Sequence, residues 1–393
     1  KLTIIILTAV IPNFPMIAAV LANTDVLARL TTQLFFWNDE KIELTNSNYS
    51  LHIENKDRNV RKNAFETLYK EYKKYANTFA SLLSMNMKEL TTMSRVSNYN
   101  SAIERSLFAD EVTIDVYNNL IDSVHSNIEY IYDYYKLKKD ILGLDELHLY
   151  DIYVPIVNDY DKKYSYEEAK EIIIKVLDVF GEEYVNKVKE ALDSRWIDVY
   201  PTKNKRTGGY SGGSYDTYPY ILLNYQDKYN DMSTLIHEMG HSMHSYYSRK
   251  YNTYQESEYR IFVAEVASTV NELLLSRYMI ENSNNKEEKL YILNNLMELY
   301  RATVYRQTMF AEFEKIISDM TDKDEALTAD KLCDVYYDLN KLYFGNDVAI
   351  DDQIKYEWER IPHFYYNFYV YKYATGLSAA TAIVKNILGG TDG

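Results

Sequence analysis

The spacing of apolar residues predicts long amphipathic helices over most of the chain. In 59–83 and in 114–142, apolar residues recur every three or four positions, which places them on one face of a helix. Asp57 can cap the first helix, because its carboxylate can accept a hydrogen bond from an unpaired backbone N–H. The two stripes contain Phe65, Leu68, Tyr69, Tyr72, Ala76, Phe79 and Leu83, and Val116, Leu120, Val124, Ile128 and Ile131. We expect a mainly helical fold with these stripes in its core.

The helical pattern continues after these two stripes. Ser165 and Glu168 have the spacing of a capping box, which predicts a helix as far as Phe180, where Gly181 ends it. A further helix is expected to about Ser194. Later in the chain, apolar spacing predicts helices over 287–317 and 327–343. In the first of these the residues expected to face inward are Leu290, Leu293, Leu296 and Tyr300.

One helical segment carries the spacing of a metal site. In Leu235–His244, His237 and His241 lie four residues apart, so that both can point to one metal ion from the same helix face. Glu238 lies beside that face, where it can act as general base on a water. Asp231 or Ser233 can cap the helix. Gly240 lies inside it at a cost of about 1 kcal/mol against alanine, and a metal ligand or a neighbouring backbone packed closely there would explain it.

A catalytic zinc site needs a third protein ligand. His244 is too far from His237, because two helical turns separate them by about 10 Å. The chain also lacks the glycine of the HExxHxxGxxH pattern. The best candidate is Glu265, which lies among the apolar residues of 261–270. A carboxylate in such surroundings needs a partner, and zinc would supply one.

The segment 196–225 interrupts the helical pattern. Its glycine pairs at 208–209 and 212–213, followed by the apolar run Tyr218–Leu223, predict short strands joined by turns. The lysine and the spacing of a phosphate-binding loop are missing. The backbone of a glycine-rich strand edge can pair with an extended peptide. Gly212 and Gly213 are therefore candidate substrate-binding residues, and a plain turn is the alternative.

Composition excludes one class of partner. The formal net charge of −15 argues against nucleic-acid binding, because the chain has no basic patch to replace counterions. The single cysteine, Cys333, allows no internal disulfide and fits a reducing compartment. The apolar run 1–22 suggests either a misassigned chain end or a signal peptide, and Pro12 and Pro15 argue against a membrane-spanning helix. We expect a cytoplasmic protein without stable membrane association, with export as the lesser alternative.

The motifs carry a family resemblance. HEMGHSMH at 237–244, followed by FVAEVAST at 262–269, resembles the thimet oligopeptidase family of zinc metallopeptidases, and more closely its bacterial branch, oligoendopeptidase F. The segments 214–225 and 363–380 are also similar to that branch. The resemblance implies one Zn²⁺ per chain, held by His237, His241 and Glu265, with Glu238 as general base. It also implies a mainly α, zincin-like fold, with a small β ribbon beside the HExxH helix and a deep cleft between helical subdomains.

The stretch 361–376 is rich in tyrosine and offers groups for the oxyanion of peptide hydrolysis. A tyrosine O–H or a histidine N–H would stabilise that charge. The resemblance implies this role for His363 and Tyr371, with Tyr365, Tyr366 and Tyr369 as rivals to Tyr371. Tyr366 and Tyr369 are also candidate substrate-binding residues. In a chain with 41 tyrosines, packing is the alternative role for each.

The resemblance covers roughly 42–390, with a zinc-binding core at about 196–380, and leaves 1–41 as an uncertain segment. Family members are longer, so that the chain resembles one cut at both ends. The implied activity is zinc-dependent hydrolysis of internal bonds in oligopeptides. The alternatives are a dipeptidyl carboxypeptidase of the same superfamily and a helical protein that binds peptides without cutting them. The sequence does not indicate an oligomeric state.

Overall fold

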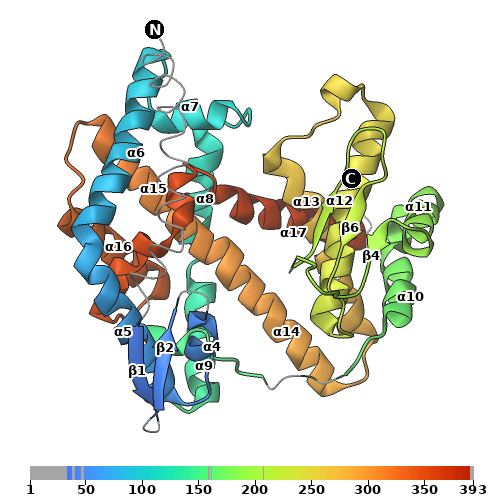
Figure 1. The fold of residues 1–393 in the computed structure, drawn as a ribbon, viewed down its shortest axis with the longest axis horizontal. Coiled ribbons are helices and arrows are strands. Elements are labelled where there is room, and N and C mark those ends of the chain that lie inside the picture. The colour runs from blue at the N-terminus through green and yellow to red at the C-terminus, as the bar shows by residue number, and fades with distance from the viewer. Residues whose placement is uncertain are drawn as a thin grey trace. The chain divides into compact units, whose positions relative to one another are not determined.

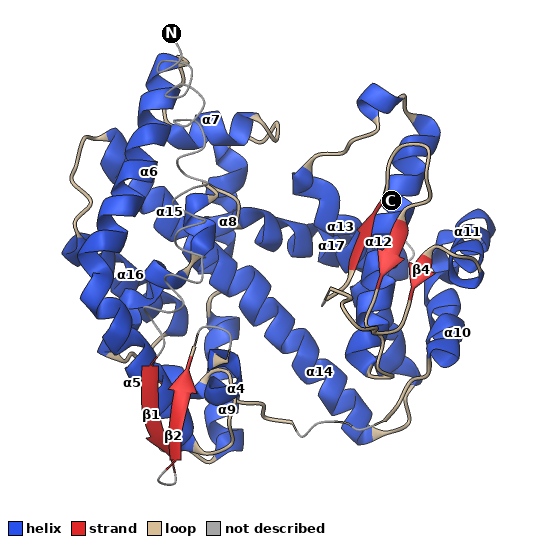
Figure 2. Ribbon diagram, in the orientation of Figure 1, coloured by secondary structure: helices blue, strands red, loops and turns tan. Residues whose placement is uncertain are grey.

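The computed structural model describes residues 33–37, 40–45, 48–157, 160, 162–206 and 208–389. It divides the chain into two compact units, Lys1–Ile156 with Tyr305–Tyr371, and Val157–Val304 with Lys372–Gly393. Helices dominate both units (Figure 2), which confirms the mainly α prediction. The apolar run predicted at 1–22 lies outside the described residues.

The first unit is built from helices and two small strand pairs (Figure 1). The strands β1 and β2 form an antiparallel hairpin that crosses the predicted boundary at residue 41. The strands β3 and β7 pair in parallel. The elements are β1 (Gln33–Trp37), β2 (Glu40–Leu44), α4 (Tyr49–Ile53), α5 (Arg58–Tyr72), α6 (Ala76–Val96), α7 (Ala102–Phe108), α8 (Ile114–Ser126), α9 (Glu129–Leu142), β3 (Leu147–His148), α15 (Arg306–Asp322), α16 (Ala329–Phe344) and β7 (Val348–Ala349).

Each of the two long helices predicted in this unit is divided into two. The expected cap is present, since the Asp57 side chain accepts a hydrogen bond from the Asn59 N–H. A 3₁₀ turn at Lys73–Tyr75 then separates α5 from α6. The helix predicted over 114–142 is interrupted at Asn127, whose side-chain amide donates to the Ser123 carbonyl. Such short breaks leave the apolar periodicity almost unchanged, so that the pattern does not reveal them.

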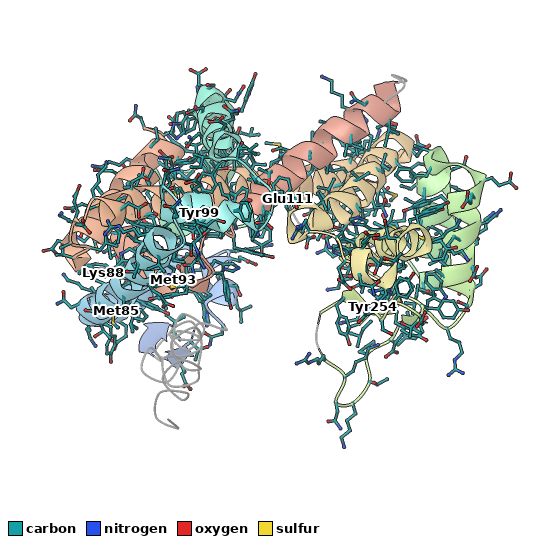
Figure 3. The ribbon with its side chains drawn as sticks, turned by 90° about the horizontal axis from the view of Figure 1, so that it is seen from above. Met85, Lys88, Met93, Tyr99, Glu111 and Tyr254 are labelled. Carbon is teal, nitrogen blue, oxygen red and sulfur yellow. The ribbon has the colours of Figure 1, made fainter. Side chains whose placement is uncertain are left out.

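The helix α6 has one buried and one exposed face. The buried face carries apolar residues and the polar side chains of Asn86, Thr91 and Ser94. The exposed face carries Met85, Lys88 and Met93, which Figure 3 labels. The core therefore lies on one side of α6, as its stripe predicted.

The second unit contains the HExxH segment. Its helices are α10 (Tyr166–Val176), α11 (Glu182–Asp193), α12 (Tyr229–Tyr251), α13 (Ile261–Asn282), α14 (Lys286–Tyr300) and α17 (Tyr371–Gly389), and its strands are β4 (Ile197–Asp198), β5 (Tyr210–Gly212) and β6 (Tyr220–Leu222). The capping box of Ser165 and Glu168 is present at the start of α10. Gly181, at φ 86°, separates α11 from the 3₁₀ turn Leu177–Phe180 that follows α10.

The strands form a three-stranded sheet in the order β4-β6-β5. β6 pairs in parallel with β4 and antiparallel with β5, with Ser211 opposite Ile221. Within the described residues, β5 pairs with β6 alone, so that no strand is paired with its other edge. Ser242 of α12 holds this sheet, because its hydroxyl contacts that of Ser211 at 2.8 Å and donates to the Pro219 carbonyl. The predicted ribbon beside the HExxH helix is confirmed.

Two predictions of inward-facing residues are wrong. In α14, Leu290 and Leu293 are exposed, whereas Ile292 is buried and Leu296 and Tyr300 pack on the core. The helix predicted over 287–317 also contains a π-helical turn, Arg301–Tyr305, before α15. In α8, Val116 is exposed and its neighbour Tyr117 is buried.

Among the described residues no helix has the length and apolarity needed to cross a membrane.

Candidate active site

The helix α12 carries His237 and His241. It begins at Tyr229, earlier than the caps expected at Asp231 or Ser233. Asp231 still stabilises the start, because its carboxylate accepts hydrogen bonds from the backbone N–H groups of Gln226 and Lys228. Buried apolar residues on the opposite face of α12 include Leu235, Ile236 and Met239. These contacts fix the rotation of the helix, and therefore the direction of both imidazoles.

The helix α13 brings Glu265 to the two histidines (α12 and α13 are labelled in Figure 1). One ligand atom from each of the three residues lies within 4.8 Å of the others. The Nε2 atoms of His237 and His241 are both 3.5 Å from Glu265 Oε2. Two atoms bonded to one tetrahedral zinc at about 2 Å lie roughly 3.3 Å apart. Two imidazoles and one carboxylate at these separations fit a zinc ion with a fourth position open.

Gly240 lets the two helices approach. A Cβ atom at this position would lie 2.6 Å from Ser268 Cα and 2.8 Å from the Ala267 carbonyl oxygen. Both neighbours are backbone atoms of α13, so that they cannot rotate away. Of the two explanations predicted for Gly240, a closely packed neighbouring backbone is confirmed, and this backbone belongs to the residues two and three positions after Glu265.

Further side chains orient the three candidate ligands, and sequence reasoning missed them. Glu272 Oε2 lies 3.2 Å from His237 Nδ1, and Ser233 donates to the other Glu272 oxygen at 3.3 Å. Ser268 donates to Glu265 Oε2 at 3.1 Å. Burial lowers the pKa of His237, but the hydrogen bond to Glu272 and the nearby charges of Glu272, Glu238 and Glu265 together raise the pKa overall. Glu272 lies two turns after Glu265 on the same helix, and this spacing was the available signal.

Glu238 lies next to the triad and is nearly buried, with 7% of its surface exposed. Burial raises the pKa of its carboxyl, while His237, His241 and a hydrogen bond from the Ser211 backbone N–H act in the opposite direction. Gly209 is also close, since a Cβ there would lie 3.5 Å from Glu238 Oε1. The strand β5 thus touches the carboxylate that sequence analysis assigned as general base.

His244 does not join the metal-binding group. Its ring stacks on Tyr259 with the centroids 3.8 Å apart, and burial lowers the pKa of the imidazole. This agrees with the expectation that a residue two turns from His237 cannot share its metal.

The candidate glycines lie at the end of β5. Gly212 is the last residue of the strand, and a side chain there would meet open space. Gly213 follows, where a Cβ would lie 2.4 Å from the Tyr218 carbonyl oxygen. A glycine is therefore required at 213 by the turn, while Gly212 leaves the open edge of β5 free of side-chain bulk.

The tyrosine-rich stretch belongs to the first unit as far as Tyr371, which includes all of its candidate residues. The ring centroid of His363 is 5.8 Å from that of Tyr366 and 6.4 Å from that of Tyr369, and the two tyrosines are 6.5 Å apart. Tyr366 is exposed, and burial lowers the pKa of His363. Tyr371 is instead buried and packs on Tyr117, with 5.0 Å between the ring centroids. The choice of Tyr371 over its neighbours for the oxyanion stays a prediction.

Comparison with known proteins places the motifs in a family. The profile of Peptidase family M3 matches residues 51–391. The chain belongs to peptidase family M3. This M3 chain is 49% identical to Oligopeptidase PepF of Bacillus subtilis (strain 168) over 346 residues, which are 88% of the chain and 52% of that relative. It is 42% identical to an Oligoendopeptidase F homolog of Lactococcus lactis subsp. lactis (strain IL1403), over 90% of the chain and 59% of that relative.

Solved structures agree with this assignment. A putative peptidase from Chlamydophila abortus has a TM-score of 0.90 and 36% identity, covering 99% of the M3 chain and 65% of its own. Oligoendopeptidase-F from Enterococcus faecium has a TM-score of 0.76 and 35% identity, covering 96% and 61%. The zincin-like fold and the resemblance to oligoendopeptidase F are thereby confirmed. The M3 chain spans about half to three-fifths of the length of the curated relatives it matches.

Proposed function

We propose that the chain carries the zinc-dependent catalytic machinery of an endopeptidase that hydrolyses internal bonds of oligopeptides. The observation that supports this most directly is the convergence of His237, His241 and Glu265 beside a buried Glu238. The printed names of the relatives, oligopeptidase and oligoendopeptidase, agree with the substrate class.

The three ligands would hold one Zn²⁺ through two imidazole nitrogens and one carboxylate oxygen. When bound, this ion would polarise the scissile carbonyl and lower the pKa of the attacking water. Glu272 and Ser268 act on the ligands themselves. Glu272 keeps the His237 ring turned so that Nε2 faces Glu265, and Ser268 restricts the Glu265 carboxylate.

Glu238 is the general base in this proposal. Its carboxylate takes a proton from the attacking water and passes it to the nitrogen of the leaving amine. The pKa of a useful base lies near the working pH, and burial moves that of Glu238 upward in this direction. The Ser211 N–H hydrogen bond restricts the carboxylate, so that one oxygen stays available for the water.

The open edge of β5 supports an extended substrate. An added peptide strand would pair with the backbone of Tyr210–Gly212, the segment that also contacts Glu238. Backbone pairing tolerates many side chains, which suits a peptidase acting on varied oligopeptides. Gly212 and Gly213 contribute by keeping this edge open and its turn tight.

His363, Tyr366, Tyr369 and Tyr371 are assigned to the oxyanion and to the substrate. A neutral imidazole N–H or a phenol O–H can donate to a developing oxyanion. Burial keeps the pKa of His363 low, which favours the neutral ring at pH 7. The exposed Tyr366 and its neighbour Tyr369 would contact the peptide.

The test is cleavage of an internally quenched oligopeptide by the purified chain, before and after removal of metal with a chelator. We expect cleavage that a chelator abolishes and stoichiometric zinc restores. Glu238→Gln should lower kcat by about 10²–10⁴-fold while zinc stays bound, because this variant removes the base and keeps the ligands. Substrates with free and amidated C-termini should be cut at similar rates if cleavage is internal.

The control is Glu256→Gln, which changes a carboxylate in the 3₁₀ turn Tyr254–Glu256 between α12 and α13. It should leave cleavage unchanged. Full activity of Glu238→Gln would contradict the role of the base, and cleavage that survives complete metal removal would contradict the metallopeptidase proposal.

A further inference from the structure

Two consecutive residues in the tyrosine-rich stretch adopt left-handed backbone conformations. Asn367 has φ 53° and Phe368 has φ 57°. Asparagine tolerates this region, but a bulky aromatic residue rarely adopts it. Residues held in sparsely populated conformations persist only where their surroundings impose them. The turn at 367–368 therefore needs an identifiable restraint.

Two buried side chains of the first unit supply that restraint. Glu314 of α15 accepts a hydrogen bond of 2.9 Å from the Phe368 N–H. Asn86 of α6 donates to the Asn367 side chain at 2.6 Å. Glu314 has no exposed surface and Asn86 is 2% exposed. The bond from Phe368 to Glu314 is buried, and that between Asn86 and Asn367 is partly buried. The Phe368 ring also packs edge to face on Tyr117, at 6.0 Å between the centroids.

The restrained turn lies between the rings that the proposed function assigns to the substrate. Tyr366 precedes it and Tyr369 follows it, and both lie within 6.5 Å of His363 or of each other by ring centroid. Between His363 and the turn, Phe364 packs against Phe310 and Phe313. This apolar contact anchors the segment that leads into the turn, while two polar contacts set the turn itself.

We propose that Glu314, assisted by Asn86, is a positioning residue that holds the 366–369 turn in its left-handed form. In this form His363, Tyr366 and Tyr369 make one surface for the oligopeptide. The inference rests on the proposed function for the role of that surface, whereas the restraint itself is independent of catalysis.

The chemistry of Glu314 suits this task. Burial raises the pKa of its carboxyl to about 8, so that the neutral acid predominates at pH 7. A neutral carboxyl can accept from the Phe368 N–H without the cost of a buried charge. Leucine at this position could fill the space but could not accept the hydrogen bond, and glutamine could do both.

The experiment compares Glu314→Leu with Glu314→Gln in the zinc-loaded chain. For Glu314→Leu we expect hydrogen exchange of peptides covering 366–370 to accelerate at least tenfold. We also expect KM for a quenched oligopeptide to rise at least fivefold, with zinc affinity unchanged. Glu314→Gln should restore both quantities to within twofold of the parent chain. Glu312→Leu, which changes a carboxylate bonded to His125 and Tyr343 on the same helix, is the matched control.

The outcomes separate the two proposals. Accelerated exchange in Glu314→Leu that is absent in Glu314→Gln supports the restraint. This holds even if the parent chain cleaves no peptide, because absence of cleavage would reject the proposed function alone. Unchanged exchange and unchanged KM in a folded Glu314→Leu chain would overturn the inference. If Glu314→Leu fails to fold, Asn86→Ala removes the second contact, and unchanged exchange in that variant would overturn it equally.

Discussion

At the scale of single residues, the contact between Glu272 and His237 explains how the imidazole of a proposed metal ligand is oriented. The carboxylate lies on Nδ1, which leaves Nε2 directed to Glu265. Such a partner fixes the tautomer and raises the basicity of the ligand. Ser233 donates to Glu272, and Glu272 contacts His237, so that the three side chains form a short chain of polar contacts.

Loss of this carboxylate should weaken metal binding. We expect Glu272→Ala to lower zinc affinity by about 10–100-fold, and Glu272→Gln to lower it less, because the amide oxygen still accepts from Nδ1–H. Competition with a chromophoric chelator measures both. Glu281→Ala, which removes an exposed partner of Arg277 on the same helix, should bind zinc like the parent chain. Equal affinities for the three variants would remove Glu272 from the site.

Two buried carboxyls give the stability a predictable dependence on pH. Burial raises the pKa of Glu314 to about 8 and that of Glu359 to about 9, from an ordinary value of 4.5. Between pH 4.5 and the folded pKa of each group, the folded chain holds more protons than the unfolded chain. The contribution of each group to the free energy of unfolding is therefore full below about pH 4.5 and is lost as the pH rises through the folded pKa.

Replacement of either group should reduce this loss. We expect Glu314→Gln and Glu359→Gln to be more stable relative to the parent chain at pH 9 than at pH 5, by about 1 kcal/mol or more. Urea denaturation of each variant at the two pH values measures the difference. A parent chain that loses no stability relative to both variants between pH 5 and 9 would show that the carboxyls are not held neutral.

At the scale of elements, the packing of α12 on α13 sets the geometry of the three proposed metal ligands. Helix propensity alone predicts that Gly240→Ala stabilises α12 by about 1 kcal/mol. The contact geometry predicts the opposite, because the new Cβ would lie 2.6 Å from backbone of α13. The steric effect should win, since inserting a carbon against fixed backbone costs about 1–3 kcal/mol.

Gly240→Ala should therefore destabilise the chain and weaken zinc binding together, because α12 carries two ligands and α13 the third. Thermal unfolding and zinc titration measure the two effects. Gly389→Ala in α17 is the control, because its Cβ would meet no atom within 4 Å. It should be neutral or slightly stabilising. A Gly240→Ala chain as stable as the control would contradict the close contact.

The elements also show which features of the site could be predicted from the sequence and which could not. The spacing of His237 and His241 implies a shared helix face, and the apolar setting of Glu265 suggests a buried partner. Glu272 was not foreseen, because its role depends on how α13 is rotated against α12. The left-handed conformation of Phe368 could not be predicted either, because an aromatic side chain does not indicate a positive φ. Leu290 and Leu293 were misplaced because periodicity identifies an apolar face without showing what covers it.

At the scale of the whole molecule, the candidate residues are divided between the two units. The proposed zinc ligands and Glu238 belong to the second unit, and the ring surface of His363, Tyr366 and Tyr369 belongs to the first. The two groups are 98 residues apart in sequence, counted from Glu265 to His363. The metal site and the ring surface can therefore be tested separately.

The most direct test of the account is zinc K-edge absorption spectroscopy on the chain loaded with one equivalent of zinc. The account predicts tight binding of one ion per chain and a first shell of nitrogen and oxygen at about 2.0–2.1 Å, with scattering from two imidazoles and none from sulfur. His241→Ala should reduce the imidazole signal to one. Binding below one equivalent, or a shell that contains sulfur or is unchanged in His241→Ala, would contradict the site of His237, His241 and Glu265.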